Sequence, residues 1–193
     1  TIENGLNAAA KGGFTEVLLK RGAKKIYAVD VGKNQLHERL KINNKVISLE
    51  RTNARYLNKE IFSHLFEIMV CDVSFISLKK IILPNLNLLS SENIIITLIK
   101  PQFESKKNEL KKGIIKDDKI HKRICDNIKE WFILECNCKI IGIIESPIKG
   151  PKGNVEFLIV AKYQKWRKQW SAIVVANIAS PTGTALIPTH GSW

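Results

Sequence analysis

The stretch "NIIITLIKPQFE", residues 93–104, holds the most apolar run of this chain and ends it abruptly. Four isoleucines and one leucine predict a strand over residues 93–99 that is buried on both faces. Strands of this kind are typical of a parallel sheet that carries helices on both sides. The run closes with Lys100 and Pro101, so a charged amine lies where the strand ends and the proline limits how the chain leaves it.

Apolar runs and amphipathic segments alternate through the residues before this strand. The expected strands cover residues 24–32, 44–54, 67–75 and 93–99, and the expected helices cover residues 12–22, 35–43 and 77–89. Gly22 is expected to end the first helix and Ser77 to cap the third. This alternation predicts an α/β fold in which parallel strands form one sheet.

The residues after this strand carry a different pattern. Residues 102–119 are polar, basic and poorly periodic, which predicts a mobile loop. From Asp118 onward a helix is expected, because four apolar side chains recur at helical spacing, namely Ile120, Ile124, Ile128 and Trp131. Residues 138–163 form two apolar runs around a segment rich in proline and glycine, which predicts an antiparallel pair at one edge of the sheet.

Three charged residues lie at the carboxyl ends of expected strands, namely Asp30, Asp72 and Lys100. In open parallel sheets, ligands bind outside these ends. A charged residue also ends a strand simply where the chain reaches water, so one such case means little. Three aligned cases favour a functional site at this edge.

The composition indicates a polyanionic partner. The chain has 193 residues, of which 45% are hydrophobic, and this is enough for one sizeable core. Its formal net charge is +13, which favours nucleic acid or an anionic membrane surface as partner. The alternative is a lysine-rich surface that is merely solvated.

The cysteines and histidines do not predict a metal site. The four cysteines are Cys71, Cys125, Cys136 and Cys138, and none forms a pair at the spacing typical of zinc ligands. We interpret them as reduced thiols. The four histidines are scattered along the chain.

Residues 1–165 are expected to form one domain, followed by an atypical apolar tail over residues 166–193. Residues 171–193 contain no Lys, Arg, Asp or Glu, which is consistent with a vector-derived extension, a frameshifted end or a genuine appendage. No run of eighteen apolar residues and no leader pattern is present, so we expect a cytoplasmic protein without a membrane span. Residues 1–10 carry no clear structural signal.

Several motifs together resemble one protein family. In chain order they are "GGFTEVLLKRGAKKIYAVDVG", "LERTNARYL", "CDVSFISL", "LIKPQFE" and "SPIKGPKGNVEFL". This set resembles the TlyA family, the hemolysin-A-like members of the FtsJ-like ribosomal RNA 2'-O-methyltransferases, over about residues 12–162. The resemblance implies a class I methyltransferase fold, with a seven-stranded, mostly parallel sheet and a final antiparallel hairpin. It also implies S-adenosylmethionine as methyl donor and a ribose 2'-hydroxyl of ribosomal RNA, typically of a cytidine, as acceptor.

The resemblance implies three catalytic residues, Asp72, Lys100 and Glu156. A ribose hydroxyl is a poor nucleophile until its proton is removed or its charge is stabilised, and a lysine can do either. Burial and a neighbouring sulfonium favour neutral Lys100, whereas Asp72 and Glu156 favour the ammonium form, so the sequence leaves its charge state open. The carboxylates are expected to orient Lys100 and the hydroxyl.

The family's donor site maps onto four segments of this chain. Gly12 and Gly13, followed by Phe14, allow close backbone approach at a helix start. Asp30 is placed to accept hydrogen bonds from the donor's ribose, with Val31 beside it. By resemblance, Asn53 lies near the adenine, and Asp72 and Val73 lie near the methionine end of the donor.

Six lysines are candidates for RNA contact, since phosphate binding needs little more than positive charge. They are Lys106, Lys107, Lys111 and Lys112 after the strand that ends at Lys100, and Lys149 and Lys152 in the hairpin turn. Each taken singly is equally consistent with an ordinary solvated lysine.

Three features depart from the family pattern. Leu6 stands where the family has an acidic residue, and Ala8 stands where it has its first glycine. No segment before Gly12 matches the family's first catalytic lysine. We also expect the family's N-terminal RNA-binding S4 domain to be absent. Two alternatives to an active enzyme therefore remain, a catalytically inactive RNA-binding module of the same fold and a membrane-active hemolysin.

Overall fold

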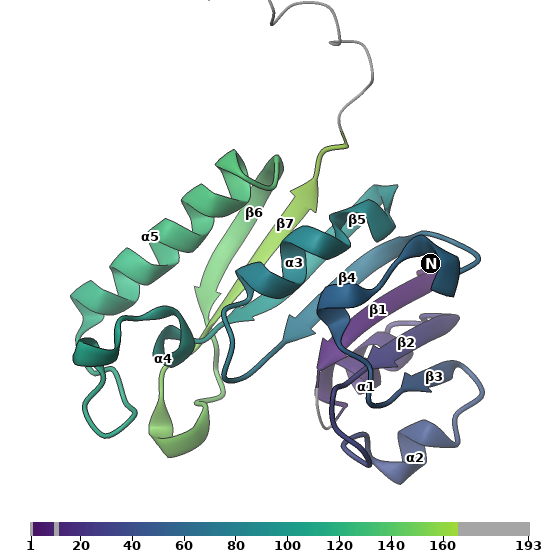
Figure 1. The fold of residues 1–193 in the computed structure, drawn as a ribbon, viewed down its shortest axis with the longest axis horizontal. Helices are drawn as coiled ribbons and strands as arrows, with labels where there is room; N and C mark the ends of the chain where they lie inside the picture. The colour runs from purple at the N-terminus through teal and green to yellow at the C-terminus, as the bar shows by residue number, and fades with distance from the viewer. Residues whose placement is uncertain (1, 10–11, 166–193) are drawn as a thin grey trace, which may run out of the picture.

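The computed structural model describes residues 2–9 and 12–165, so the expected tail lies outside the described residues. One seven-stranded sheet runs in the order β3-β2-β1-β4-β5-β7-β6 (Figure 1). The strands are β1 (Asn4–Ala9), β2 (Lys25–Val29), β3 (Val46–Leu49), β4 (Phe66–Asp72), β5 (Leu89–Ile99), β6 (Cys138–Glu145) and β7 (Phe157–Tyr163). The α-helices are α1 (Gly13–Lys20), α2 (Glu38–Lys41), α3 (Lys79–Asn85), α4 (Pro101–Glu104) and α5 (Asp118–Leu134).

Strands β1 to β5 are parallel to one another, as the alternation of strands and helices predicts. Strand β7 pairs antiparallel with both β5 and β6, so the expected hairpin is confirmed and β6 forms the edge. The predicted mostly parallel sheet with an antiparallel end is therefore confirmed. The paired strands β1 and β4 lie near the middle of the sheet. The carboxyl ends of all five parallel strands lie on the same side of it.

The central strand β1 is the element that the sequence did not reveal. Its residues, "NGLNAA", include Asn, Gly and Ala, which have low β propensity, and they show no alternation of polar and apolar side chains. Its pairing with β2 on one side and β4 on the other satisfies its backbone instead. A Cβ atom at Gly5 would lie 3.3 Å from both Ile68 and Leu18, so a small residue here lets α1 pack close to the sheet.

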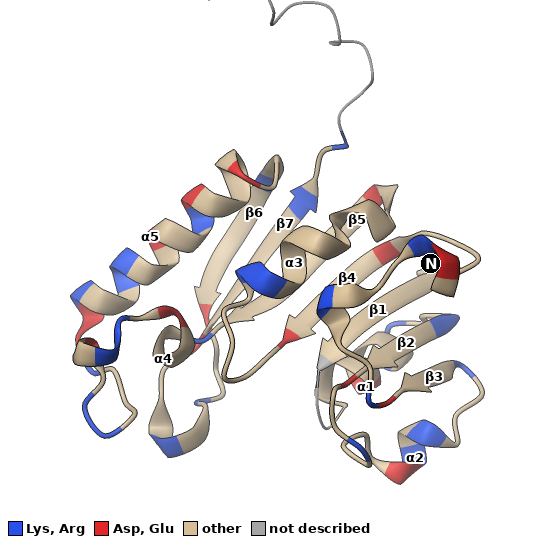
Figure 2. Cartoon of the chain, in the orientation of Figure 1, with Lys and Arg blue, Asp and Glu red and all other residues tan. Residues whose placement is uncertain are grey.

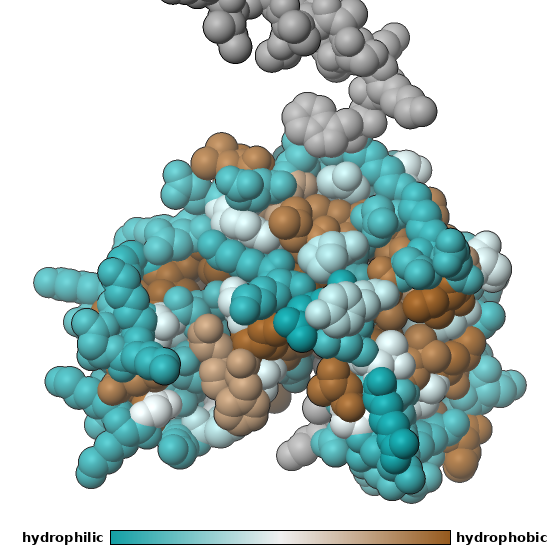
Figure 3. Space-filling view, viewed as in Figure 1, coloured by the Kyte–Doolittle hydropathy of each residue, from teal (hydrophilic) through white to brown (hydrophobic). Residues whose placement is uncertain are grey.

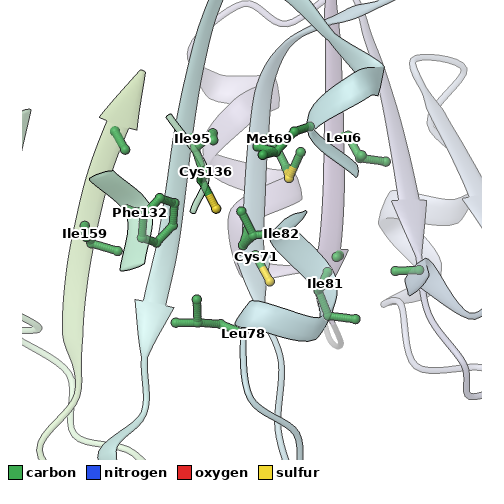
Figure 4. Packing of buried hydrophobic residues seen from close by; sticks show 14 of the residues in the cluster. Leu6, Met69, Cys71, Leu78, Ile81, Ile82, Ile95, Phe132, Cys136 and Ile159 are labelled. Atoms are coloured by element: carbon green, nitrogen blue, oxygen red, sulfur yellow. The ribbon is translucent and has the colours of Figure 1, made fainter. Parts of the chain in front are cut away.

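Helices cover both faces of the sheet. The larger hydrophobic cluster joins α3 and α5 to one face, through Ile82, Phe132 and the strand residues Met69, Ile95 and Ile159 (Figure 4). The smaller cluster joins α1 to the other face, where Leu18 packs with Ile26, Ile68 and Val70. Alternate residues of β4 therefore belong to opposite faces, as expected for a strand that is buried on both sides.

The segment predicted as a loop over residues 102–119 is more ordered than its pattern suggested. It contains most of α4, a 3₁₀ turn over Lys107–Glu109 and a β-bridge between Lys111 and Ile114. The side chain of Glu109 accepts hydrogen bonds from the backbone of Lys106 and from Arg123 on α5. Polar contacts of this kind leave no apolar periodicity, so the prediction of a loop missed them.

Helix α3 begins with a shared cap. The N-cap of α3 is Leu78 and not the predicted Ser77, although the Ser77 hydroxyl accepts a hydrogen bond from Lys79 N at 3.3 Å. The first free amide, that of Leu78, instead donates to a carboxylate from α4.

No helix in the described part of the chain is long and apolar enough to cross a membrane.

Helix α5 supplies a matched test of this packing. Ile128 lies on the face of the helix that packs against the sheet and is 2% exposed. Ile133 lies on the solvent-facing side and is 45% exposed. We expect Ile128→Ala to lower the free energy of unfolding by about 2–5 kcal/mol, because it leaves a cavity in the larger cluster. The same change at Ile133 should cost less than about 1 kcal/mol. Equal losses of stability in urea unfolding of the two variants would contradict this assignment of the core.

Candidate active site

A cavity of about 530 Å³ opens outside the carboxyl ends of β1, β2 and β4. In the view of Figure 3, the lower edge of the molecule is hollowed at this end of the strands. Five of the residues predicted to bind the donor line the cavity, namely Asp30, Val31, Asn53, Asp72 and Val73. Ala8, Val29 and Ile81 add apolar walls, so the cavity combines an apolar surface with a few polar groups, as ligand sites do.

The polar groups at the two ends of this cavity are held by local turns. Asp30 follows β2, and its Oδ1 accepts a hydrogen bond from Gly32 N at 2.7 Å, which leaves its other oxygen for a ligand. Asn53 caps the 3₁₀ turn over Ala54–Tyr56, and its Oδ1 accepts from Arg55 N at 3.1 Å. Both side chains are therefore oriented before any ligand arrives.

The glycine segment has a different environment from the one predicted. Gly12, Gly13 and Phe14 are not among the residues that line the cavity. Gly12 adopts φ 93°, and a Cβ atom there would lie 2.9 Å from Leu36 Cδ1, so packing against the segment around α2 also demands a glycine. Donor contact by these three residues stays a prediction.

The two departures from the family motif fall in different places. Leu6 is 1% exposed within the larger hydrophobic cluster and does not line the cavity. Ala8 does line it, near the point where β1 meets β2 and β4. Of the two, only Ala8 bears directly on the shape of the cavity.

Lys100 and Asp72 form an ion pair beside the cavity, which Asp72 lines and Lys100 does not. The Lys100 Nζ lies 2.5 Å from Asp72 Oδ1 and donates a hydrogen bond to Ser74 Oγ at 3.1 Å. Lys100 itself is 9% exposed, because it follows the buried end of β5 and begins α4. The prediction that these two residues come together is confirmed in the geometry, and Ser74 is a contact that the sequence did not single out.

The third predicted catalytic residue lies on the next strand pair. Ile99 of β5 lies opposite Phe157 of β7, so Lys100 and Glu156 follow at the adjoining position of the antiparallel register. Glu156 is 5% exposed, and its Oε1 accepts a hydrogen bond from Gln102 Nε2 at 3.2 Å. The ends of β4, β5 and β7 thus bring the three predicted residues to one region.

An exposed aromatic pair lies beside the lysine. Phe75 follows Ser74 in a left-handed conformation, with φ 64°, and is 90% exposed. Its ring centroid is 5.0 Å from that of Phe103 on α4. A bulky side chain held at positive φ and in water is unusual, and such strain is commonly found at functional positions.

Glu104 connects the two segments that flank the ion pair. Its carboxylate accepts hydrogen bonds from Ser77 Oγ and Leu78 N, both at 2.7 Å. Burial raises the pKa of this carboxyl above its usual value, although the two hydrogen bonds act in the opposite direction. Helix α4, which follows Lys100, is in this way attached to the start of α3, which follows the loop after Asp72.

The six candidate RNA-binding lysines are exposed. They belong to two segments, the stretch between α4 and α5 and the β6–β7 connection, both of which carry basic positions in Figure 2. Asn154 joins these segments: its Oδ1 accepts from Ile115 N at 3.3 Å, and its Nδ2 donates to Gly113 O at 3.1 Å. Lys152 Nζ also donates to Lys112 O at 3.4 Å. None of the six ammonium groups pairs with a carboxylate within residues 2–9 and 12–165. They therefore present unneutralised positive charge on one surface.

The cysteines lie away from solvent. All four are buried free thiols, and burial raises the pKa of Cys71, which precedes Asp72, to about 12. In the described part of the chain, no group of three or more His, Cys, Asp and Glu side chains could hold a metal ion.

The sheet order and the cavity define a class of protein. A seven-stranded sheet with an antiparallel last pair, and a ligand cavity outside the parallel carboxyl ends, is a class I methyltransferase fold. Residues 7–163 match the family model described as FtsJ-like methyltransferase. The chain belongs to this family.

Named relatives agree with this assignment. The chain is 46% identical over 152 residues to Hemolysin A of Brachyspira hyodysenteriae, covering 78% of this chain and 63% of that protein. It is 42% identical over 156 residues to the 23S rRNA (cytidine-2'-O)-methyltransferase TlyA of Campylobacter jejuni, covering 77% and 57%. A solved structure of a candidate hemolysin from Streptococcus thermophilus superimposes with a TM-score of 0.80 at 35% identity, covering 84% of this chain and 59% of that one. The chain thus spans roughly three-fifths of the relatives that it matches.

The buried carboxyl of Glu104 predicts a pH-dependent contribution to stability. Because its pKa in the folded chain is raised above 4.5, the neutral form stabilises the fold, fully below that value and progressively less as pH rises through the raised pKa. We expect Glu104→Gln, which stays neutral, to lack this decline. The free energies of unfolding of the parent and the variant are to be compared by urea titration from pH 4 upward, roughly across that window. Parallel pH profiles for the two proteins would contradict the prediction.

Proposed function

We propose that this chain transfers a methyl group from S-adenosylmethionine to a ribose 2'-hydroxyl of ribosomal RNA. The observation that carries the proposal is the ion pair between buried Lys100 and half-buried Asp72, which lines the cavity, with Glu156 at the adjoining position before β7. The relative named as a 23S rRNA (cytidine-2'-O)-methyltransferase supports both the acceptor and the choice of cytidine. Ribosomal RNA as substrate is consistent with action in the cytoplasm.

The cavity fits a donor of this type. Its volume of about 530 Å³ lies within the range of pockets that hold ligands of cofactor size. Asp30 offers a carboxylate oxygen to ribose hydroxyls, and Asn53 offers an amide beside Ala54, where an adenine would lie. Val73 and Ala8 leave an apolar wall for the methionine end. When bound, S-adenosylmethionine supplies an electrophilic methyl group on a sulfonium.

The residues of the chain position and activate the acceptor. Asp72 holds the Lys100 amine beside the cavity. As an ammonium, Lys100 would donate a hydrogen bond to the ribose oxygen and stabilise the negative charge that develops there while the hydroxyl proton leaves to water; as a neutral amine, it would accept that proton itself. In either case an oxygen–methyl bond would form as the sulfur–methyl bond of the donor breaks. Glu156 orients the hydroxyl and the lysine. Such in-line transfer depends mainly on positioning, which agrees with the burial of Lys100 and Glu156 and with their hydrogen bonds to Ser74 and Gln102.

The exposed ring of Phe75 suits the base of the acceptor nucleotide. Aromatic side chains stack on unpaired bases, and Phe75 is attached through Ser74 to the lysine that contacts the ribose. The six exposed lysines then hold the phosphates on either side of that nucleotide. The two unusual features of this surface, the aromatic pair and the unneutralised charge, thus contact the base and the phosphates of the acceptor RNA.

The catalytic role of Lys100 has a direct test. We expect Lys100→Ala to lower the rate of labelled-methyl transfer to ribosomal RNA by at least about 100-fold, because the acceptor loses its proton or charge partner. Lys80→Ala, an exposed lysine on α3, is the matched control and should retain the parent rate. Residual activity of Lys100→Ala within about tenfold of the parent would refute the role.

Calorimetric titration with S-adenosylmethionine separates the proposal from an inactive RNA-binding module. The parent chain and Lys100→Ala should bind the donor equally, since Lys100 does not line the cavity. A folded parent chain that binds ribosomal RNA but not the donor would favour the inactive module, and would point to Ala8 as the cause.

The lysine surface predicts the salt dependence of RNA binding. Replacing Lys112 and Lys152 by glutamine should reduce the slope of log affinity against log salt by about 1–2, because each phosphate contact releases a counterion. Lys139→Gln is the control, since this exposed lysine lies at the opposite end of β6 from the hairpin connection. Binding of a ribosomal RNA fragment is to be measured between 50 and 200 mM salt, roughly the range over which such contacts weaken. An unchanged slope in the double variant would place the RNA elsewhere.

A further inference from the structure

The single helical turn of α4 contacts every segment that carries a proposed catalytic residue. Its first flanking residue is Lys100 itself. Of the side chains that follow, Gln102 reaches Glu156, Phe103 packs against Phe75, and Glu104 reaches Ser77 and Leu78. A single helical turn is too short to form an apolar stripe. These contacts, rather than core packing, therefore determine where α4 lies.

The contact between Gln102 and Glu156 is buried on both sides. Gln102 is 9% exposed and Glu156 is 5% exposed, and the Gln102 amide donates to Glu156 Oε1 at 3.2 Å. A buried carboxylate without a donor is costly, so the amide determines where this carboxylate can rest. The Gln102 amide carries no charge, so it supports the Glu156 carboxylate by hydrogen bonding alone.

The same carboxylate oxygen, Oε1, also lies against a glycine. A Cβ atom at Gly150 would lie 2.6 Å from Glu156 Cδ and still closer to Oε1. Gly150 has φ −74°, which any residue adopts, so the glycine is required for space rather than for backbone conformation. Two separate segments, α4 and the β6–β7 connection, thus both contact Oε1 of Glu156.

We propose that Gln102 is a positioning residue for methyl transfer, acting through Glu156 against the wall formed by Gly150. This inference rests on the proposed function, because it concerns the same reaction. Gln102 holds the carboxylate at the adjoining position to Lys100, and Gly150, which lacks a Cβ atom, leaves space for the carboxylate there. Loss of either partner lets Glu156 move away from the acceptor while the donor cavity, which neither residue lines, is unchanged.

A kinetic double-mutant cycle tests this role. We expect Gln102→Ala to lower kcat for methyl transfer by about 10- to 100-fold, with KM for the donor unchanged, since small misplacements of catalytic groups have effects of this size. In a Glu156→Ala background, Gln102→Ala should have no further effect, because the group it positions is gone. Gln164→Ala, an exposed glutamine just after β7, is the matched control and should behave as the parent in both backgrounds.

Gly150→Ala provides a second variant that leaves α4 untouched. It should lower kcat in the parent, where the added methyl meets the carboxylate, and should be neutral in Glu156→Ala, where that space is empty. Circular dichroism and thermal unfolding confirm that each variant is folded. The inference is overturned if folded Gln102→Ala and Gly150→Ala keep the parent kcat. It is also overturned if their effects are equally large without Glu156, which would make them general structural residues.

The two proposals fail in different ways. A parent chain that transfers no methyl group to ribosomal RNA overturns the proposed function and this inference with it. A parent chain that is active, and that loses activity in Glu156→Ala but not in Gln102→Ala, overturns the positioning role alone.

Discussion

The ion pair of Lys100 and Asp72 depends on two parallel strands that end side by side. An ammonium and a carboxylate attract most strongly where water is scarce. Lys100 is 9% exposed because the strand before it buries one face fully and the other in part, whereas its partner Asp72 keeps 31% of its side chain exposed. The apolar run of β5 and the charged residue that ends it are therefore parts of one arrangement. The apolar run excludes water from the end of the sheet, and this strengthens the attraction between Lys100 and Asp72.

Burying charge at this edge is costly, and the surrounding residues offset that cost. Ser74 accepts from Lys100, Gln102 donates to Glu156, and Glu104 receives two hydrogen bonds of its own. Burial nevertheless raises the pKa of Glu104, so part of the cost remains in the folded chain. Such residual strain, together with the exposed Phe75 at positive φ, is typical of a site that is built for function rather than for stability.

The front of the domain is where this chain departs most from the family pattern, and its consequences are local. Leu6 packs in the larger hydrophobic cluster, whereas Ala8 lines the cavity. Membership of the FtsJ-like methyltransferase family rests on residues 7–163 and does not depend on these two positions alone. Of the two positions, only Ala8 lies where it can contact a ligand of the cavity, whereas Leu6 contributes to the core.

Periodicity in the sequence was sufficient for β2, β4, β5, α5 and the final hairpin, because each buries an apolar face that repeats with its own period. It also placed Asp30, Asp72 and Lys100 at strand ends, which was enough to predict one site at one edge of the sheet. It was not sufficient for β1, whose weak propensities are overridden by two neighbouring strands, or for α4, which is held by polar contacts.

The contacts of Gln102, Glu104 and Asn154 became visible only in the tertiary structure, although each lies in or next to a motif that was already recognised. Their partners are between 26 and 54 residues away, and a hydrogen bond across such a separation leaves no pattern in the chain. By itself, the sequence therefore determined the fold class, the family and the charged residues of the site, since these follow from local order and composition. Only the tertiary structure decided what holds those residues in place, because that depends on which distant segments the sheet brings together.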